Sequence, residues 1–116
     1  MGTELITTAS AVTTGVKNVY DITTQLIRNR KQNKLITKGE LQYLEVQMTK
    51  TIQLARQDAR HKLSMSAQRN LEESYSHVAE CDPNSPLGQM ALELLRSEWQ
   101  AYLSYSRDFD ELTELF

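Results

Sequence analysis

Apolar side chains recur at intervals of three and four residues along most of this chain, a pattern typical of helices that bury one face. In residues 4–32 the repeating positions are Leu5, Ala9, Val12, Val16, Val19, Thr23 and Leu26. These side chains are small or β-branched and Gly15 lies among them, so we expect this helix to depend on packing against its neighbours. A polar, basic run at residues 28–34 predicts the first turn, because basic side chains suit the carboxyl end of a helix.

The start of the second helix has the clearest local signal in the chain. Thr37 followed three residues later by Glu40 predicts a capping box, and Ile36 with Leu41 predicts a hydrophobic staple, so this helix should begin near Lys38. Its apolar stripe then consists of Leu41, Leu44, Met48, Ile52, Ala55, Ala59, Leu63, Ala67, Leu71, Tyr75 and Val78.

The stripe passes through residues 38–80 without a change of phase, which favours one long helix. At about 1.5 Å per residue, such a helix would extend about 65 Å. The alternative is a break at residues 64–66, because Ser64 and Ser66 compete for backbone hydrogen bonds and favour helix N-caps. That break would add a fourth helix.

Residues 82–86 predict a loop followed by a third helix, since Ser85 is a typical N-cap and Pro86 a typical first helical residue. The apolar positions of residues 86–107 are Leu87, Met90, Ala91, Leu94, Leu95, Trp99, Tyr102 and Leu103. Their arc is wider than contact with one neighbour requires, so this helix should touch two elements. Asp108 and Glu111 resemble a further capping box, so residues 109–116 either continue the helix or form a short final one.

The 116 residues fit one domain, residues 1–116. We expect an all-α fold with coiled-coil-like seams: an elongated antiparallel helical hairpin or three-helix bundle, with four helices if the second one breaks. The first helix should lie along the first half of the second, and the third along its other half.

Charge divides the chain into two unequal parts. Residues 1–70 contain eleven Lys and Arg against five Asp and Glu, whereas residues 71–116 contain two against ten. The two parts can neutralise each other within the bundle or attract separate partners. The lone Cys81, the absence of a signal-like start and the lack of a long apolar run predict a cytoplasmic protein without a transmembrane segment.

Candidate chemistry is sparse. Glu73, His77 and Cys81 are spaced by four residues and share a helical face, but no fourth ligand lies nearby in the sequence, and chance placement explains the trio better. No phosphate-binding glycine loop, nucleophile motif or histidine pair with metal spacing is present. The sequence therefore predicts a protein that is not an enzyme and that uses no metal or cofactor.

Apolar residues outside the main stripes favour another protein as partner. On the second helix these residues are Tyr43, Val46, Leu54 and Met65, and near the carboxyl end they are Phe109, Leu112, Leu115 and Phe116 among acidic residues. The carboxyl segment either docks on a partner or closes its own bundle. We expect a helical interaction module of the adaptor, chaperone or immunity-protein type, which can also form a homodimer.

The alternative function is nucleic-acid binding through the turn that contains Arg28, Arg30, Lys31 and Lys34, with Lys38 nearby. Against this interpretation, the pI is about 5.7 and no aromatic side chain interleaves with the cluster. Solvation of a helix end explains the basic turn equally simply. Membrane attachment through the first helix is disfavoured, because that helix lacks a basic face and large apolar anchors.

Overall fold

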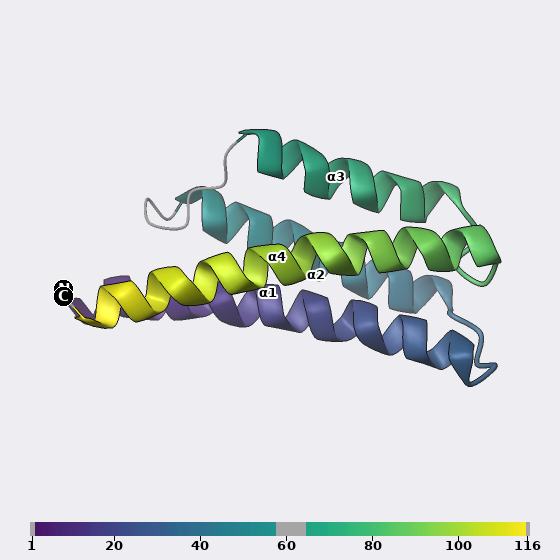
Figure 1. Ribbon diagram of the computed structural model, residues 1–116, viewed down its shortest axis with the longest axis horizontal. Helices are drawn as coiled ribbons and strands as arrows, with labels where there is room; N and C mark the ends of the chain where they lie inside the picture. The colour runs from purple at the N-terminus through teal and green to yellow at the C-terminus, as the bar shows by residue number, and fades with distance from the viewer. Residues whose placement is uncertain (1, 58–64, 116) are drawn as a thin grey trace.

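The computed structural model describes the backbone of residues 2–57 and 65–115 and the side chains of residues 11–57 and 66–104. In chain order, the described helices are α1 (Gly2–Lys31), α2 (Lys38–Gln57), α3 (Met65–Glu80) and α4 (Pro86–Leu115), and no strand occurs among these residues. Figure 1 shows them side by side along one long axis, with overall extents of 47 × 26 × 20 Å. The predicted all-α bundle is confirmed.

The basic turn after α1 closes with a left-handed residue. Asn33 has a φ of 61°, a conformation that Asn tolerates better than most side chains do. The amide of Lys34 donates to the carbonyl of Asn29 at 2.8 Å, and the amide of Asn33 donates to the carbonyl of Arg30 at 3.0 Å. This pair of bonds is the Schellman motif, which satisfies carbonyls that the helix end leaves without partners.

The predicted capping box at the start of α2 is present. The hydroxyl of Thr37 accepts a hydrogen bond from the amide of Glu40 at 3.2 Å, and the Glu40 carboxylate accepts one from the amide of Thr37 at 3.3 Å. Ile36 is buried and Leu41 packs against the core, as a hydrophobic staple requires. The helix begins at Lys38 as predicted.

The turn between α3 and α4 is also specified locally. The Ser85 hydroxyl accepts a hydrogen bond from the amide of Gly88 at 3.0 Å and donates to the carbonyl of Asp82 at 2.6 Å. Ser85 is therefore the N-cap, with Pro86 as the first helical residue. Glycine is required at position 88, because a Cβ atom there would collide with the carbonyl oxygen of Asp82.

One side chain joins this turn to the turn between α1 and α2. The Asn84 side-chain oxygen accepts a hydrogen bond from the amide of Ile36 at 2.7 Å, and its amide nitrogen donates to the Ile36 carbonyl at 3.1 Å. Asn84 thus satisfies both backbone groups of a buried residue far away in the sequence. We call this pair of bonds the Asn84 clamp.

Within the range expected to form one helix, α2 ends at Gln57 and α3 begins at Met65. The Arg56 guanidinium bonds to the side chain of Gln68 at 2.8 Å, and the Tyr75 hydroxyl bonds to Glu45 at 3.2 Å. In a single straight helix, the 30 residues between positions 45 and 75 would span about 45 Å. The chain therefore turns back, and α3 lies beside α2 (Figure 1). The predicted alternative, a break at residues 64–66, falls partly outside the described residues.

Helices α1 and α4 make most of the packing contacts. Helix α1 contacts α4 most extensively and also contacts α2, while α3 packs against α4. The expected contact between residues 86–107 and residues 65–80 is therefore present, but α4 contacts α1 more extensively than it contacts α3. The core consists of Val12, Val16, Val19, Leu26, Ile27, Ile36, Leu44, Met48, Ile52, Ala55, Leu71, Val78, Ala91, Leu92, Leu95 and Trp99.

The α1–α2 contact depends on Gly15. A Cβ atom at this position would lie 2.6 Å from the Thr51 hydroxyl oxygen, too close for ordinary packing. The two helices can therefore approach each other closely because residue 15 has no side chain. Thr51 itself is buried, and its hydroxyl donates to the carbonyl of Gln47 at 2.8 Å.

Helix α4 is a single helix through Leu115, so residues 109–115 continue it. It touches two elements as its wide apolar arc predicts, through Leu92, Leu95 and Trp99, which are fully buried. Three other residues of the arc, Leu87, Met90 and Leu94, are however exposed. Over the described residues, no helix is long and apolar enough to cross a membrane.

Candidate functional site

The outer face of α2 carries three large exposed apolar side chains, which we call the α2 strip. Tyr43, Val46 and Leu54 are 57%, 47% and 37% exposed. Lys50 is also exposed and lies four residues after Val46 and four before Leu54, so helical spacing places its side chain in the same row. The sequence predicted these apolar residues as a second strip outside the buried stripe, and the structure places them at the surface.

Local charge distinguishes this face. From position 46 to the end of α2 the sequence contains no Asp or Glu. The last carboxylate before that stretch is Glu45, and it accepts a hydrogen bond from Tyr75 on the side of α2 that faces α3. The α2 strip is therefore apolar with one central cation.

A second exposed row, the α4 strip, consists of Leu87, Met90 and Leu94, which are 69%, 61% and 64% exposed. Glu98 is exposed and lies one turn after Leu94, and Glu93 is exposed beside it. The sequence predicts that the arc containing these three apolar residues contacts two neighbouring elements. The buried ridge of Ala91, Leu92, Leu95 and Trp99 makes those contacts instead. In the sequence, only the excess width of the apolar arc indicated that part of it would stay exposed.

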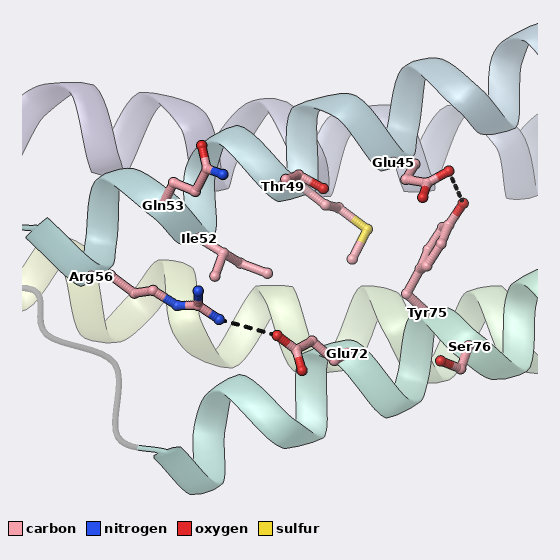
Figure 2. Close-up of a pocket in the computed structure, with 9 residues that line it drawn as sticks. Glu45, Thr49, Ile52, Gln53, Arg56, Glu72, Tyr75 and Ser76 are labelled. Atoms are coloured by element: carbon pink, nitrogen blue, oxygen red, sulfur yellow. Dashed lines mark hydrogen bonds and ion pairs between the residues drawn. The ribbon is translucent and has the colours of Figure 1, made fainter.

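Between α2 and α3 lies a groove of about 330 Å³ (Figure 2). Met48 and Ile52 form its apolar floor, although both are more than nine-tenths buried. In Figure 2, the side chains of Arg56 and Glu72 meet across one end of the groove, and those of Glu45 and Tyr75 meet across the other. The groove is therefore bridged at both ends by polar side chains from the two helices.

These bridges are electrostatically different. The Arg56 guanidinium lies 3.2 Å from the Glu72 carboxylate, in the one ion pair found among the described side chains, and both side chains are about half exposed. The Tyr75 hydroxyl donates to Glu45 at 3.2 Å. Partial burial and then the nearby Glu45 charge raise the pKa of Tyr75 to about 12, because both disfavour the phenolate.

A further hollow of about 430 Å³ lies where α1 meets the first turns of α2. Ile22 and Leu26 of α1 line it together with Tyr43, and Gln25, Thr37, Gly39 and Glu40 complete its wall. Tyr43 thus belongs both to this hollow and to the α2 strip. A partner side chain that packs on the strip would have a neighbouring apolar recess within reach.

The basic turn is exposed but not organised as a groove. Arg28, Lys31 and Lys34 are exposed, and Arg30 is partly buried, with a long contact of 3.5 Å from its guanidinium to the carbonyl of Lys34. A hollow beside Arg30 and Lys31 is also lined by the acidic residue Glu93. This mixed charge favours phosphate binding less than an all-basic lining would.

Several predicted contact residues fall outside the described side chains. Met65 is the first residue of α3, and Phe109, Leu112 and Leu115 belong to the last turns of α4, but their side chains are not among those described. Phe116 lies outside the described residues altogether. The proposed docking role of the carboxyl segment stays a prediction.

The face with Glu73, His77 and Cys81 gains no further ligand from the fold. Glu73 and His77 are exposed, and Cys81 is a free, half-buried thiol. Among the described side chains, no group of three His, Cys, Asp or Glu is arranged to hold a metal ion.

Comparisons with protein-family models, with curated proteins and with solved structures found no match to this chain.

Proposed function

We propose that this protein is a non-enzymatic helical module that binds another protein through an outer face of its bundle. The observation that carries this proposal is the α2 strip, in which Tyr43, Val46 and Leu54 remain exposed although the bundle has a fully buried core. Large apolar side chains at helical spacing are the usual anchors of helix-mediated protein recognition. Large apolar side chains also cost free energy when they stay in water.

The mechanism is presentation of a rigid surface. The capping box, the Asn84 clamp and the close α1–α2 contact at Gly15 hold the strip in a fixed orientation, so little conformational entropy is lost on binding. Tyr43 would be the main anchor, because its ring is large and borders the hollow beside Ile22 and Leu26. A cytoplasmic adaptor, chaperone or immunity-type inhibitor would work in this way.

Site-specific photocrosslinking in the native source tests the proposal. A photoreactive phenylalanine analogue would replace Tyr43 or Leu54 in the α2 strip, and Glu73 on the exposed face of α3 in a matched control. We expect one defined protein adduct from positions 43 and 54 and none from position 73. Adducts from position 73 alone, or no protein adduct from either strip position, would contradict a role for this face.

The alternative function is nucleic-acid binding through the basic turn. It is supported by Arg28, Lys31 and Lys34, which are exposed and form no ion pair among the described side chains. If the alternative holds, binding should weaken steeply with salt, and the combined change of Arg28, Arg30, Lys31 and Lys34 to Ala should abolish it. Nucleic-acid binding that survives these changes would exclude the turn as the contact.

A further inference from the structure

The α2 and α4 strips lie on opposite sides of the molecule. Helix α1 contacts both α2 and α4, and α3 packs against α4 while its side chains bridge to α2. This pattern places α2 and α4 at diagonal corners of the bundle. In Figure 1, α4 lies at the front and α2 behind it, and both helices run in the same direction. Because each strip lies on the solvent-facing side of its helix, the two strips point away from each other.

The two strips also match in spacing. The α2 row consists of Tyr43, Val46, Lys50 and Leu54, and the α4 row of Leu87, Met90, Leu94 and Glu98. In both rows the second, third and fourth positions follow the first by three, seven and eleven residues. Each row extends about 16 Å along its helix. Laid side by side in parallel, they would bring Tyr43 level with Leu87 and Val46 level with Met90.

Their charges are complementary in that alignment. Lys50 would lie between the levels of Glu93 and Glu98, within about one helical turn of either carboxylate. In the antiparallel alignment, Lys50 would instead lie near the level of Met90, still close to Glu93 but about two helical turns from Glu98. The α2 face offers no carboxylate after Glu45. On α4, Arg96 is the single basic residue between Leu87 and Glu98, and it is half-buried. Opposite charges beside apolar rows therefore favour the parallel arrangement.

From these observations we infer that the occupant of the α2 strip is the α4 strip of a second copy of this chain. The inference rests on the proposed function and names its partner. Since α2 and α4 are parallel within one copy and their strips face opposite ways, each added copy would keep its neighbour's orientation. The contact is heterologous, so the assembly would grow as an open row rather than close as a dimer.

Association should be weak and reversible, because each strip offers only a few large side chains. Sedimentation velocity at low salt, from about 10 µM to about 1 mM, should show a weight-average mass that rises continuously with concentration. A constant monomer mass over this range would overturn the inference. It would leave the proposed function intact if crosslinking at positions 43 and 54 still captures a different protein.

A charge exchange tests the alignment. In Lys50→Glu alone, the new carboxylate would lie within about one helical turn of the native Glu93 and Glu98 of the next copy. In Glu98→Lys alone, the new ammonium group would lie within about one turn of the native Lys50. Each variant should need roughly tenfold higher concentration to associate, whereas their equimolar mixture should associate like the native chain. Both positions are exposed, so circular dichroism should show unchanged helix content. A mixture that associates no better than the separate variants would overturn the pairing.

Disabling each strip separately distinguishes a heterologous contact from a symmetric one. Tyr43→Ser with Leu54→Ser disables the α2 strip, and Met90→Ser with Leu94→Ser disables the α4 strip. We expect each double variant to be monomeric and their mixture to stop at a complex of two chains, since each chain then retains one working strip. A variant that dimerises by itself would show a symmetric contact and overturn the inference.

Discussion

The α1–α4 contact and the α2–α3 contact are built on different principles. The helices of the first pair pack closely along their length and carry most of the fully buried side chains, among them Val12, Val16 and Trp99. The second pair stays further apart, and the hydrogen bonds and the ion pair that bridge it are exposed, with a groove between them. Stability should therefore come mainly from the first contact, because buried apolar area contributes more than exposed polar bonds do.

The largest expected effect is from Trp99→Ala at the close-packed side. Trp99 is fully buried, so truncation removes its apolar area and leaves a cavity, which should lower the free energy of unfolding by about 3–5 kcal/mol. Urea denaturation followed by circular dichroism measures the change. Leu94→Ala on the exposed face of the same helix is the control and should alter stability by no more than about 0.5 kcal/mol. Equal losses would contradict the placement of the two residues.

Gly15→Ala should have an intermediate effect by pushing α1 away from α2. The new methyl group would meet the buried Thr51 side chain, and such overpacking costs about 1–3 kcal/mol, partly offset by about 1 kcal/mol of helix propensity. In a double-mutant cycle with Thr51→Ala, the second change should relieve the collision, giving a coupling energy of at least about 1 kcal/mol. Purely additive stabilities would show that the two helices do not meet at this point.

Arg56→Ala should have a small effect, because it removes an exposed bridge of the α2–α3 contact. Its ion pair with Glu72 joins side chains that are 48% and 59% exposed, and such pairs contribute about 0–1 kcal/mol. Thermal unfolding should shift little, and added salt should reduce the difference further. A loss comparable to that of Trp99→Ala would mean that the polar bridges, and not the core, hold α3 in place.

Tyr75→Phe should leave stability near neutral pH almost unchanged and alter only its dependence on alkaline pH. The pKa of Tyr75 is raised from 10.0 to about 12, so the folded state favours the protonated phenol. Because the folded state disfavours the phenolate, the free energy of unfolding is unaffected by this group below pH 10 and falls as pH rises from 10 through about 12. Denaturation midpoints at stepped pH should therefore fall more steeply for the native chain than for Tyr75→Phe. Parallel curves would show that Glu45 and burial do not act on this hydroxyl.

The two turns with local capping signals were predictable from sequence. Thr37 with Glu40 and Ser85 with Pro86 each specify a helix start within four residues, independently of the rest of the fold. The reversal between α2 and α3 has only a weak local signal, the serines at positions 64 and 66. Residues 58–64 contain neither Pro nor Gly, and the apolar stripe continues through them. A continuous stripe is compatible with one helix or two, and only packing against α1 and α4 decides between them.

Of the candidate surfaces, the α2 strip was predictable and the α4 strip was not. Tyr43, Val46 and Leu54 fall outside a stripe that is already wide enough to fill the core, so their exposure follows from helix geometry. On α4 the apolar arc is continuous, and nothing local distinguishes Leu94 from Leu95. Which of them is buried depends on where α1 and α3 lie, and this information is absent from a single helix.

The Asn84 clamp gives the bundle a fixed end. It joins the turn before α2 to the turn after α3, so the α1–α2 and α3–α4 hairpins share a pivot there. Because α1 and α4 pack along their length, the freedom to separate lies mainly with the outer helices α2 and α3, and their separation should be smallest beside the clamp and increase with distance from it. Tyr75 and Glu45 lie nearer the clamp than Arg56 and Gln68 do. The groove between α2 and α3 should therefore widen first at its Arg56 end.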